Sequence, residues 1–550
     1  MRNPVQQVAV LTCLAAFWAA CSSTEPLVKP CTTANSVPVG ALAVAAYASV
    51  EPGPDGCASF DANVSADTIE YLVVAQSGGS NPNRVAEFRL AGEAQMTAPP
   101  VMASLQAGGT PSPAEQFHTM LREREAKLTN ERPAPGERVL SVQPPPSVGE
   151  QRGFRVCSDL RCQPPMRNVT GQVVAVGQNL ALYVDVTALN SLTQADYDSL
   201  VDVFDERAYA VDTAAFGLPS DVDLNGVVLA LMTPAINRLV SDSVCRTSGF
   251  IAGYFFGADL ALPNNANYNN AEMFYALVPD PGGQYSCTHS VARVKQLIPV
   301  VFVHELQHMI SFNYHVIQPE ASFLESEVLW LNEALSHYAE ELGGRTYLPD
   351  DNAMFSSYLT GNVRNAYDYL SNTGDHFLVN IFGSGTLGER GAGWLFMRYL
   401  VDQLATDTTT AAWNAVTKQL VQTANVGVAN IQSRTGVPFE QTVARWGLAN
   451  WVSDLPNFPT PPELRYRSWR FRTTYGGLYP SIFPKPYPLD PPVTLAANVD
   501  VTGTLRSGSG VYERVLQAPG SPAFTLQLAE ANGTPFNPGL DPRLTVIRVR

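Results

Sequence analysis

The chain has 550 residues, of which 45% are hydrophobic, and a formal net charge of −15 at pH 7. This length predicts about three domains with sizeable cores. The negative charge argues against nucleic acid as a partner, because phosphates would be repelled and no basic cluster offsets the repulsion. After the N-terminal segment, no apolar run approaches the ~18 residues that a membrane-spanning helix needs.

Residues 1–20 are predicted to be an export signal, in which Arg2 precedes a short apolar run. The run is too short for a permanent membrane helix, and the small residues Ala19-Ala20 stand where signal peptidases cleave. Cys21 follows them and resembles a bacterial lipobox cysteine, so the mature chain is expected to carry lipid at Cys21 and to be anchored at the cell envelope, in the bacterial outer membrane. Trp18 stands where leucine is usual, and secretion after cleavage without lipid is the alternative.

Six cysteines remain after Cys13 in the signal and Cys21. An even number in an exported chain predicts three disulfides. A structural zinc cluster is the alternative, but the spacings do not match those of zinc knuckles. Nearest-neighbour pairing predicts the bonds Cys31–Cys57, Cys157–Cys162 and Cys245–Cys287.

Two segments, residues 21–98 and 456–550, contain short runs in which apolar and polar residues alternate. In the first segment, Ile69–Val73 and Val85–Phe88 enclose a turn rich in Gly and Asn, as paired strands do. The second segment holds comparable runs, such as Val511–Leu516. Each segment is predicted to form a small all-β domain of its own.

Residues 99–153 are rich in Pro, Gly and Ser and are predicted to form a linker. The linker carries one expected helix, with Ser112 and Glu115 forming a capping box around Pro113 in the first turn. His118 lies on this helix, and a solvated surface position is expected for it.

The central segment, residues 154–455, is predicted to form a domain with a sheet lobe and a helical lobe. An edge strand of the sheet would bind an extended peptide by strand addition. Apolar runs predict the strands at 171–176, 180–186, 227–232, 250–256 and 273–278, and helical periodicity predicts helices at 392–404, 408–424 and 439–452.

Asp221, Asp223 and Asn225 stand in a D-x-D-x-N-G segment that opens like a calcium loop. Met232 occupies the twelfth position, where such loops carry glutamate. The segment therefore predicts either a partial calcium site on these three residues or an ordinary turn into a strand.

The segment Val301–Ile310 is predicted to be an apolar helix that carries His304, Glu305 and His308. Positions i and i+4 lie on the same face of a helix, so both histidines can direct a ring nitrogen at one ion. Glu305 is rotated away from this pair and would approach the water that the metal activates, as the general base of a zinc protease does. A solvated helix face is the alternative, but the chain has only 7 histidines and the run is too apolar for it.

A third ligand distinguishes the classes of zinc site. The metzincin spacing would place a histidine at position 314, and His315 misses that position by one residue, about 100° of helix rotation. A second helix is predicted at Val328–Glu341, and Glu333 on this helix is the best third ligand. Together with His304 and His308 it would form a His2Glu zinc site with water in the fourth position.

The pairing of His304-Glu305-x-x-His308 with Trp330-Leu331-Asn332-Glu333 resembles the gluzincin metallopeptidases, most of all the hyicolysin-type family of secreted bacterial zinc proteases. The likeness covers roughly residues 155–454, and only these two motifs are specific to it. The resemblance implies an α+β fold in which a zincin catalytic domain, made of a mixed β-sheet lobe and a helical lobe, is flanked here by the two small all-β domains.

Two positions depart from this family: Ala334 stands where glycine is usual, and His337 where an acidic residue is usual. In related zinc peptidases, an acidic side chain near there orients the first histidine through its other ring nitrogen. Glu340 or Glu341 is expected to take over this task. The residues expected to support the ligands by hydrogen bonds are Asn332, His337 and Glu340.

The resemblance also implies a side chain that stabilises the transition state beside the zinc. In related aminopeptidases a tyrosine has this role, and Arg390 stands at the matching position. Tyr367, Tyr369 and His376 compete with Arg390 for it.

These features predict an exported, Zn²⁺-dependent endopeptidase that acts on proteins or peptides. Glu305 would take a proton from the attacking water and deliver one to the leaving amine. An aminopeptidase is the rival within the same class, but no motif that would hold a free substrate amine is visible. A different class is a zinc-binding surface lipoprotein that acts in adhesion or binding without cleavage, and such a protein would not need Glu305.

Overall fold

The computed structural model describes residues 31–53, 55–96, 111–128, 143–262, 265–318, 325–380, 385–532 and 534–550. The predicted export signal and the lipidation site Cys21 lie outside these ranges. Within them, no helix is both long and apolar enough to cross a membrane. The described chain combines helices with β-sheets, which confirms an α+β protein.

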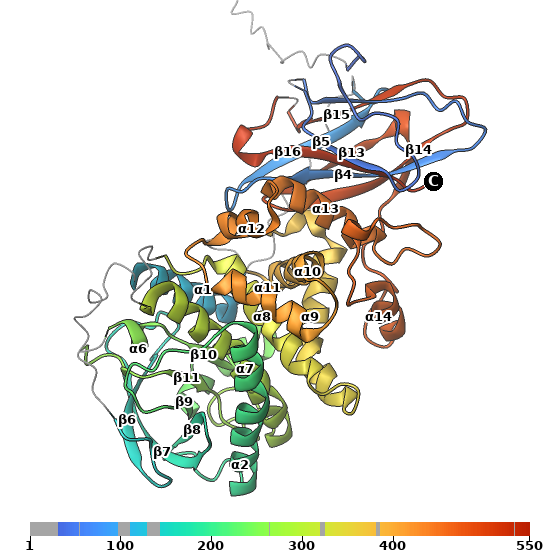
Figure 1. Cartoon of the computed structure of the whole chain (residues 1–550). Helices are drawn as coiled ribbons and strands as arrows, with labels where there is room; N and C mark the ends of the chain where they lie inside the picture. Colours follow the sequence, from blue (N-terminus) through green and yellow to red (C-terminus); the bar gives the residue numbers. More distant parts are fainter. Residues whose placement is uncertain are drawn as a thin grey trace, which may run out of the picture.

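Strands from both ends of the chain form one β-sandwich, which lies at the top of Figure 1. Side chains of both sheets form a common core, in which Phe60 and Phe524 stack with ring centroids 4.4 Å apart. The first sheet has the order β1 (Val37–Pro38), β3 (Cys57–Phe60), β15 (Phe524–Glu530), β5 (Val85–Gly92), β13 (Asp500–Arg506). The second has the order β12 (Val493–Leu495), β14 (Gly510–Gln517), β4 (Ile69–Ser77), β16 (Pro542–Arg548), β2 (Tyr47–Val50).

The expectation of two separate β-rich domains is therefore wrong. The N-terminal strand β4 pairs antiparallel with the C-terminal strands β14 and β16 on either side. The N-terminal strand β5 likewise lies between β13 and β15. Neither segment alone could satisfy the backbone hydrogen bonds of these strands, because each supplies the neighbours that the other lacks.

A third sheet, of six strands, lies at the opposite end of the molecule from the sandwich (Figure 1). Strands β8, β9 and β11 pair in parallel, while β6, β7 and β10 run antiparallel to their neighbours, which confirms the mixed sheet. Strand β10 is one edge of this sheet. In order across the sheet, the strands are β10 (Gly253–Phe255), β11 (Met273–Ala276), β9 (Val228–Met232), β8 (Leu180–Asp185), β7 (Arg167–Val176), β6 (Gln151–Val156).

Helices join the sheet to the sandwich (Figure 1). Helix α7 (Val291–Phe312) begins at Ser290, whose hydroxyl accepts from the Arg293 N–H, and it packs on β10 and β11. Helix α8 (Leu329–Arg345) contacts α7, α9 (Asn352–Ser371) and α10 (Leu387–Leu404), so it is buried over most of its length. The remaining longer helices towards the sandwich are α11 (Thr410–Val421), α12 (Gly427–Thr435) and α13 (Phe439–Val452).

Shorter helical segments complete the described chain. They are α2 (Gln194–Val203), η1 (Phe204–Tyr209), α3 (Ala210–Ala215), α4 (Pro234–Asn237), α5 (Asp242–Ser248), α6 (Ala258–Ala261), η2 (Asn313–Ile317), η3 (Thr373–Asp375), η4 (Pro462–Leu464), α14 (Phe471–Leu478), η5 (Ala496–Asn498) and η6 (Pro538–Leu540).

The helix predicted within the linker, α1 (Pro113–Leu128), forms with the expected capping box between Ser112 and Glu115. It is not a solvated spacer. Phe117 and Leu121 are fully buried, and Phe117 meets the Tyr254 ring of β10 edge to face at 5.1 Å. The apolar face of α1 therefore belongs to the core around the six-stranded sheet.

The three disulfides predicted by nearest-neighbour pairing are confirmed. The structure bonds Cys31 to Cys57, Cys157 to Cys162, and Cys245 to Cys287. Cys31–Cys57 lies in the sandwich, whereas the other two bonds lie beside the six-stranded sheet.

Candidate metal centre

The two histidines of α7 face one point, as their spacing predicts. The Nε2 atoms of His304 and His308 lie 3.2 Å apart, and both side chains are buried. Two ligands 2.0–2.1 Å from a tetrahedral ion would be about 3.3 Å apart, so this separation suits a shared zinc ion.

Glu333 of α8 completes the cluster. Its Oε2 lies 3.8 Å from His304 Nε2, and its Oε1 lies 3.6 Å from His308 Nε2. The packing of α8 against α7 thus brings the three predicted ligands together from two helices.

Hydrogen bonds at the far side of each ring orient the histidines. His304 Nδ1 donates to Glu340 Oε1 over 2.8 Å, and His308 Nδ1 donates to Asn332 Oδ1 over 3.0 Å. These bonds place the ring protons on Nδ1 and leave both Nε2 lone pairs free to bind an ion. Asn362 of α9 donates to the second Glu340 oxygen over 3.0 Å, which fixes that carboxylate.

The charges of these groups are strongly coupled. Burial opposes ionisation of Glu340, but the neighbouring histidines outweigh burial and lower its pKa to about 2. Burial likewise opposes protonation of His304, yet the hydrogen bond to Glu340 and the nearby carboxylates raise its pKa. His337 lies in the same cluster, with its Nδ1 3.2 Å from Glu340 Oε1 and its ring 5.1 Å from that of His304.

The Glu333 carboxylate is buried but poorly satisfied. Within the part of the chain that the structure describes, neither of its oxygens has a hydrogen-bond partner. Burial would raise its pKa, but Arg390, with Nη1 3.7 Å from Oε2, and the two histidines hold that pKa well below its usual range. A buried carboxylate that stays ionised without hydrogen bonds is costly, so a cation on these oxygens would stabilise it.

Glu305 lies on α7 beside this cluster but outside it. Its Oε2 accepts a 2.8 Å hydrogen bond from the Phe255 N–H of the edge strand β10. Burial raises its pKa, and the charges of His304 and Arg122 partly oppose the rise. The side chain therefore connects the helix that carries both histidines to the edge of the sheet.

The residues that sequence reasoning missed lie on α1. Arg122 donates to the Phe255 carbonyl over 2.8 Å and pairs with Glu125 at 3.1 Å, and both side chains are buried. Glu125 in turn accepts from the Gly257 N–H over 2.9 Å. Phe117 and Leu121, four positions apart on this helix, were the available signal that one of its faces is buried.

His118, expected on the surface, is partly buried, and the charges of Arg390 and Glu333 affect its pKa. Burial and the Arg390 charge lower its pKa to about 3, while Glu333 opposes the shift. His118 is therefore neutral at physiological pH.

Three of the predicted stabilising residues are not brought to the histidines. The Tyr369 hydroxyl lies 3.2 Å from Ser509 Oγ, and its ring stacks on Trp446 next to the sandwich. Tyr367 stacks on Phe483, and His376 lies 4.0 Å from Asp368. Only Arg390, of the residues proposed for this role, contacts the metal centre.

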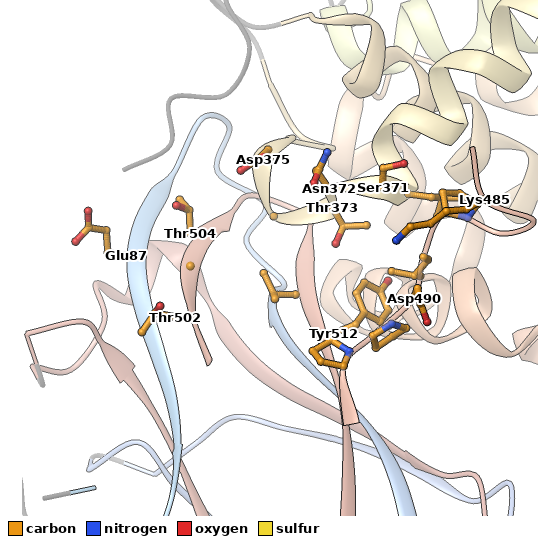
Figure 2. Close-up of a pocket in the computed structure, with 18 residues that line it drawn as sticks. Glu87, Ser371, Asn372, Thr373, Asp375, Lys485, Asp490, Thr502, Thr504 and Tyr512 are labelled. Atoms are coloured by element: carbon orange, nitrogen blue, oxygen red, sulfur yellow. The ribbon is translucent and has the colours of Figure 1, made fainter. Parts of the chain in front are cut away.

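Cavities of very different size lie at the centre and elsewhere. A cavity of about 20 Å³ beside Glu333 is lined by Thr119 and Arg390, and it has room for about one water molecule. A cavity of about 420 Å³ lies between the sandwich and the end of α9, far from the histidines, with Asp375 and Lys485 at its walls (Figure 2). The larger cavity contains none of the predicted site residues.

Asp221 and Asp223, the predicted calcium residues, lie together in the loop before β9. Their third acidic neighbour is Glu272, which precedes β11, while the Asn225 side-chain oxygen accepts from the Val227 N–H over 2.8 Å.

No protein-family model matches the chain. It is 25% identical over 204 residues to the neutral metalloprotease ShpI of Staphylococcus hyicus. The matched stretch is 35% of this chain and 43% of that protein, so the match spans less than half of the relative's length. Together with the cluster of two histidines and a glutamate, this similarity supports a relationship to metalloproteases.

Proposed function

We propose that the chain is an exported, zinc-dependent peptidase that cleaves internal peptide bonds of proteins or peptides. The observation that carries this proposal is the buried Glu333 carboxylate, which has no hydrogen-bond partner among the described residues and faces the Nε2 atoms of His304 and His308. Two histidines and a glutamate are the donor set of catalytic zinc sites, which keep a fourth position for water or substrate. The similarity to a metalloprotease supports the same assignment.

Zinc at this site would supply Lewis acidity, which polarises a peptide carbonyl and acidifies water. Glu305 would accept the proton of the attacking water, because a buried carboxylate with a raised pKa is a stronger base than an exposed one. The same carboxyl would then give the proton to the leaving amine. Its hydrogen bond to the Phe255 N–H fixes this base against the edge strand β10. Arg122 and Glu125 of α1 already pair with outer backbone groups of this edge, at the Phe255 carbonyl and the Gly257 N–H.

Arg390 would stabilise the negative charge that develops on the substrate oxygen. Its guanidinium is permanently charged and lies 3.7 Å from Glu333, next to the ligand cluster. His118, which is neutral, could donate one hydrogen bond to the same oxygen.

Export to an oxidising compartment is part of the proposal. The three disulfides support it, because such bonds persist outside the reducing cytoplasm. The predicted signal and a lipid anchor at Cys21 would place the enzyme at the bacterial cell envelope.

The decisive experiment compares the mature protein with Glu305→Gln for zinc content and for hydrolysis of casein and of an N-acetylated peptide. Glu305→Gln should keep one zinc per chain and lose about 10²–10⁴-fold in kcat/KM, because only the proton acceptor is removed. Glu206 is exposed on η1, so Glu206→Gln is the matched control and should behave like the wild type.

Cleavage of the N-acetylated peptide supports an endopeptidase, because an aminopeptidase needs a free amine. Zinc binding without any cleavage by the wild type would overturn the peptidase proposal in favour of a zinc-binding surface lipoprotein. Cleavage by Glu305→Gln at the wild-type rate would overturn the role of Glu305.

A further inference from the structure

A second group of carboxylates lies where two neighbouring strands of the six-stranded sheet begin. Asp221 and Asp223 belong to the loop that leads into β9, and Glu272 directly precedes β11. These strands pair in parallel, and the Leu229 N–H donates to the Glu272 carbonyl over 2.7 Å, so their starts lie side by side. One carboxylate oxygen of each acid lies within 4.8 Å of the other two.

Glu272 provides independent evidence for a ligand at this point. Its side chain is only 2% exposed, and its Oε1 accepts from Ser220 Oγ over 2.6 Å and from the Val222 N–H over 2.8 Å. Its Oε2 has no hydrogen-bond partner in the described ranges of the chain. A buried carboxylate oxygen is rarely left without a partner, and a bound cation would satisfy this one.

The charges around Asp221, Asp223 and Glu272 do not neutralise these three carboxylates. Arg152 is the cation whose charge acts on Asp223, but its guanidinium donates to the Asn269 carbonyl over 2.7 Å. Burial raises the pKa of Glu272 to about 7, and the charge of Asp223 adds to the rise. Burial also raises the pKa of Asp223 to about 6.

We propose that Asp221, Asp223 and Glu272 bind a calcium ion. All the donors are oxygens, which calcium prefers, whereas zinc sites use imidazole or thiolate. Asp221 is exposed, so water molecules can complete the six to eight ligands that calcium takes.

This site differs from the one that the loop sequence alone predicts. The twelfth position of the loop, where calcium loops carry glutamate, is Met232 in the buried strand β9. Glu272 supplies the missing carboxylate from a strand that pairs with β9. The bound ion would join the loop to the start of β11, whose other neighbour is the edge strand β10 beside Glu305.

Calorimetric titration of the zinc-loaded full chain with CaCl2, after passage over a chelating resin, tests the proposal. We expect one saturable site with a Kd in the range of about 10⁻⁴–10⁻³ M, as in extracellular calcium modules, and a rise in Tm of several degrees at saturating calcium. Glu272→Gln and Asp221→Asn should each weaken calcium binding at least tenfold and abolish the rise in Tm. Glu206→Gln, which removes an exposed charge from η1, should keep both.

Asp221→Asn changes an exposed side chain, so it tests the site even if Glu272→Gln fails to fold. Zinc content, measured on every sample, should stay the same, which separates this site from the metal centre. Absence of saturable calcium binding by the wild type up to about 10 mM, or equal binding by Asp221→Asn, would overturn the proposal. Failure of the peptidase assay would leave both results unchanged, because neither readout uses activity.

Discussion

Helix α8 carries two buried glutamates in opposite situations. Glu341 accepts hydrogen bonds from Arg345 and Arg398, and from the indole N–H groups of Trp394 and Trp469, at 2.8–3.3 Å. Glu333, on the same helix, has no hydrogen-bond partner in the described ranges, and its closest arginine nitrogen is 3.7 Å away.

The two glutamates differ in how the chain compensates a buried negative charge. Burial alone would raise the pKa of Glu341, but Arg345 and Arg398 lower it, so the chain itself neutralises this charge. At Glu333 the described residues supply nearby positive charge, with Arg390 Nη1 at 3.7 Å, but no hydrogen-bond donor. Oxygens without hydrogen-bond partners in the described ranges, rather than burial, therefore set Glu333 apart from Glu341.

The largest expected effect is at Glu333. Glu333→Gln should lower zinc affinity by at least about 10³-fold, because it removes one of three protein ligands. Loss of a residue that only hydrogen-bonds to a ligand already lowers metal affinity about 10–100-fold. The free energy of unfolding of the metal-free protein should fall by less than in Glu341→Leu, because the change removes charge contacts with Arg390 and the histidines but no hydrogen bond within the described ranges. Competition with a chromogenic chelator and urea unfolding measure the two quantities. A strong loss of metal-free stability would contradict the comparison.

Glu341 should show the reverse. Among the described residues, Glu341→Leu leaves the buried Arg398 with Asp402 as its one carboxylate partner, at 2.9 Å, and should lower the free energy of unfolding by about 3–5 kcal/mol. Any folded fraction should keep its zinc affinity. Asp242→Ala, which breaks the exposed pair with Arg246, is the control and should leave the urea midpoint unchanged. An equally small effect of Glu341→Leu would remove the distinction between the two glutamates.

Glu327, just before α8, is an intermediate case, because within the described ranges it has hydrogen-bond donors but no ion-pair partner. It accepts from the backbone N–H groups of Val328 and Gly427 and from Asn430, and burial still raises its pKa from 4.5 to about 7. Because the folded state holds this proton more tightly, the stability it contributes is complete below pH 4.5 and is lost as pH rises to 7. The loss is about 3 kcal/mol.

Urea unfolding of the wild type and Glu327→Gln between pH 4.5 and 8 measures this contribution. The difference in unfolding free energy between the two proteins should change by about 3 kcal/mol across that window. A difference that stays constant with pH would show that Glu327 is ionised throughout.

Local patterns in the sequence predicted the parts of the centre that lie within one helix. The spacing of His304 and His308 and the apolar run around them specify the ligand face of α7. Glu333 could be identified because its own helix carries a recognisable motif. The disulfides followed from proximity along the chain, where short loops favour neighbouring cysteines.

Contacts between distant segments could not be predicted in the same way. Alternation within β4 shows that it is a strand but not that β14 and β16 are its neighbours. Glu272 joins Asp221 and Asp223 only through the pairing of β9 with β11. The partners of the metal ligands divide in the same manner: Asn332 stands next to Glu333 in its motif, whereas Asn362 reaches Glu340 from another helix.

The smallest expected effect concerns Glu340, a buried carboxylate whose neighbours are the rings of His304 and His337. Glu340→Gln keeps an acceptor for His304 Nδ1 but removes the charge that makes this ring a strong ligand, so zinc affinity should fall about 10–100-fold. Asn332→Ser replaces only a neutral acceptor at His308 and should cost less than Glu340→Gln. Zinc competition on both variants, with circular dichroism to verify folding, gives the order. If Asn332→Ser weakens zinc more than Glu340→Gln, the charge of Glu340 serves the fold, as that of Glu341 does, rather than the metal.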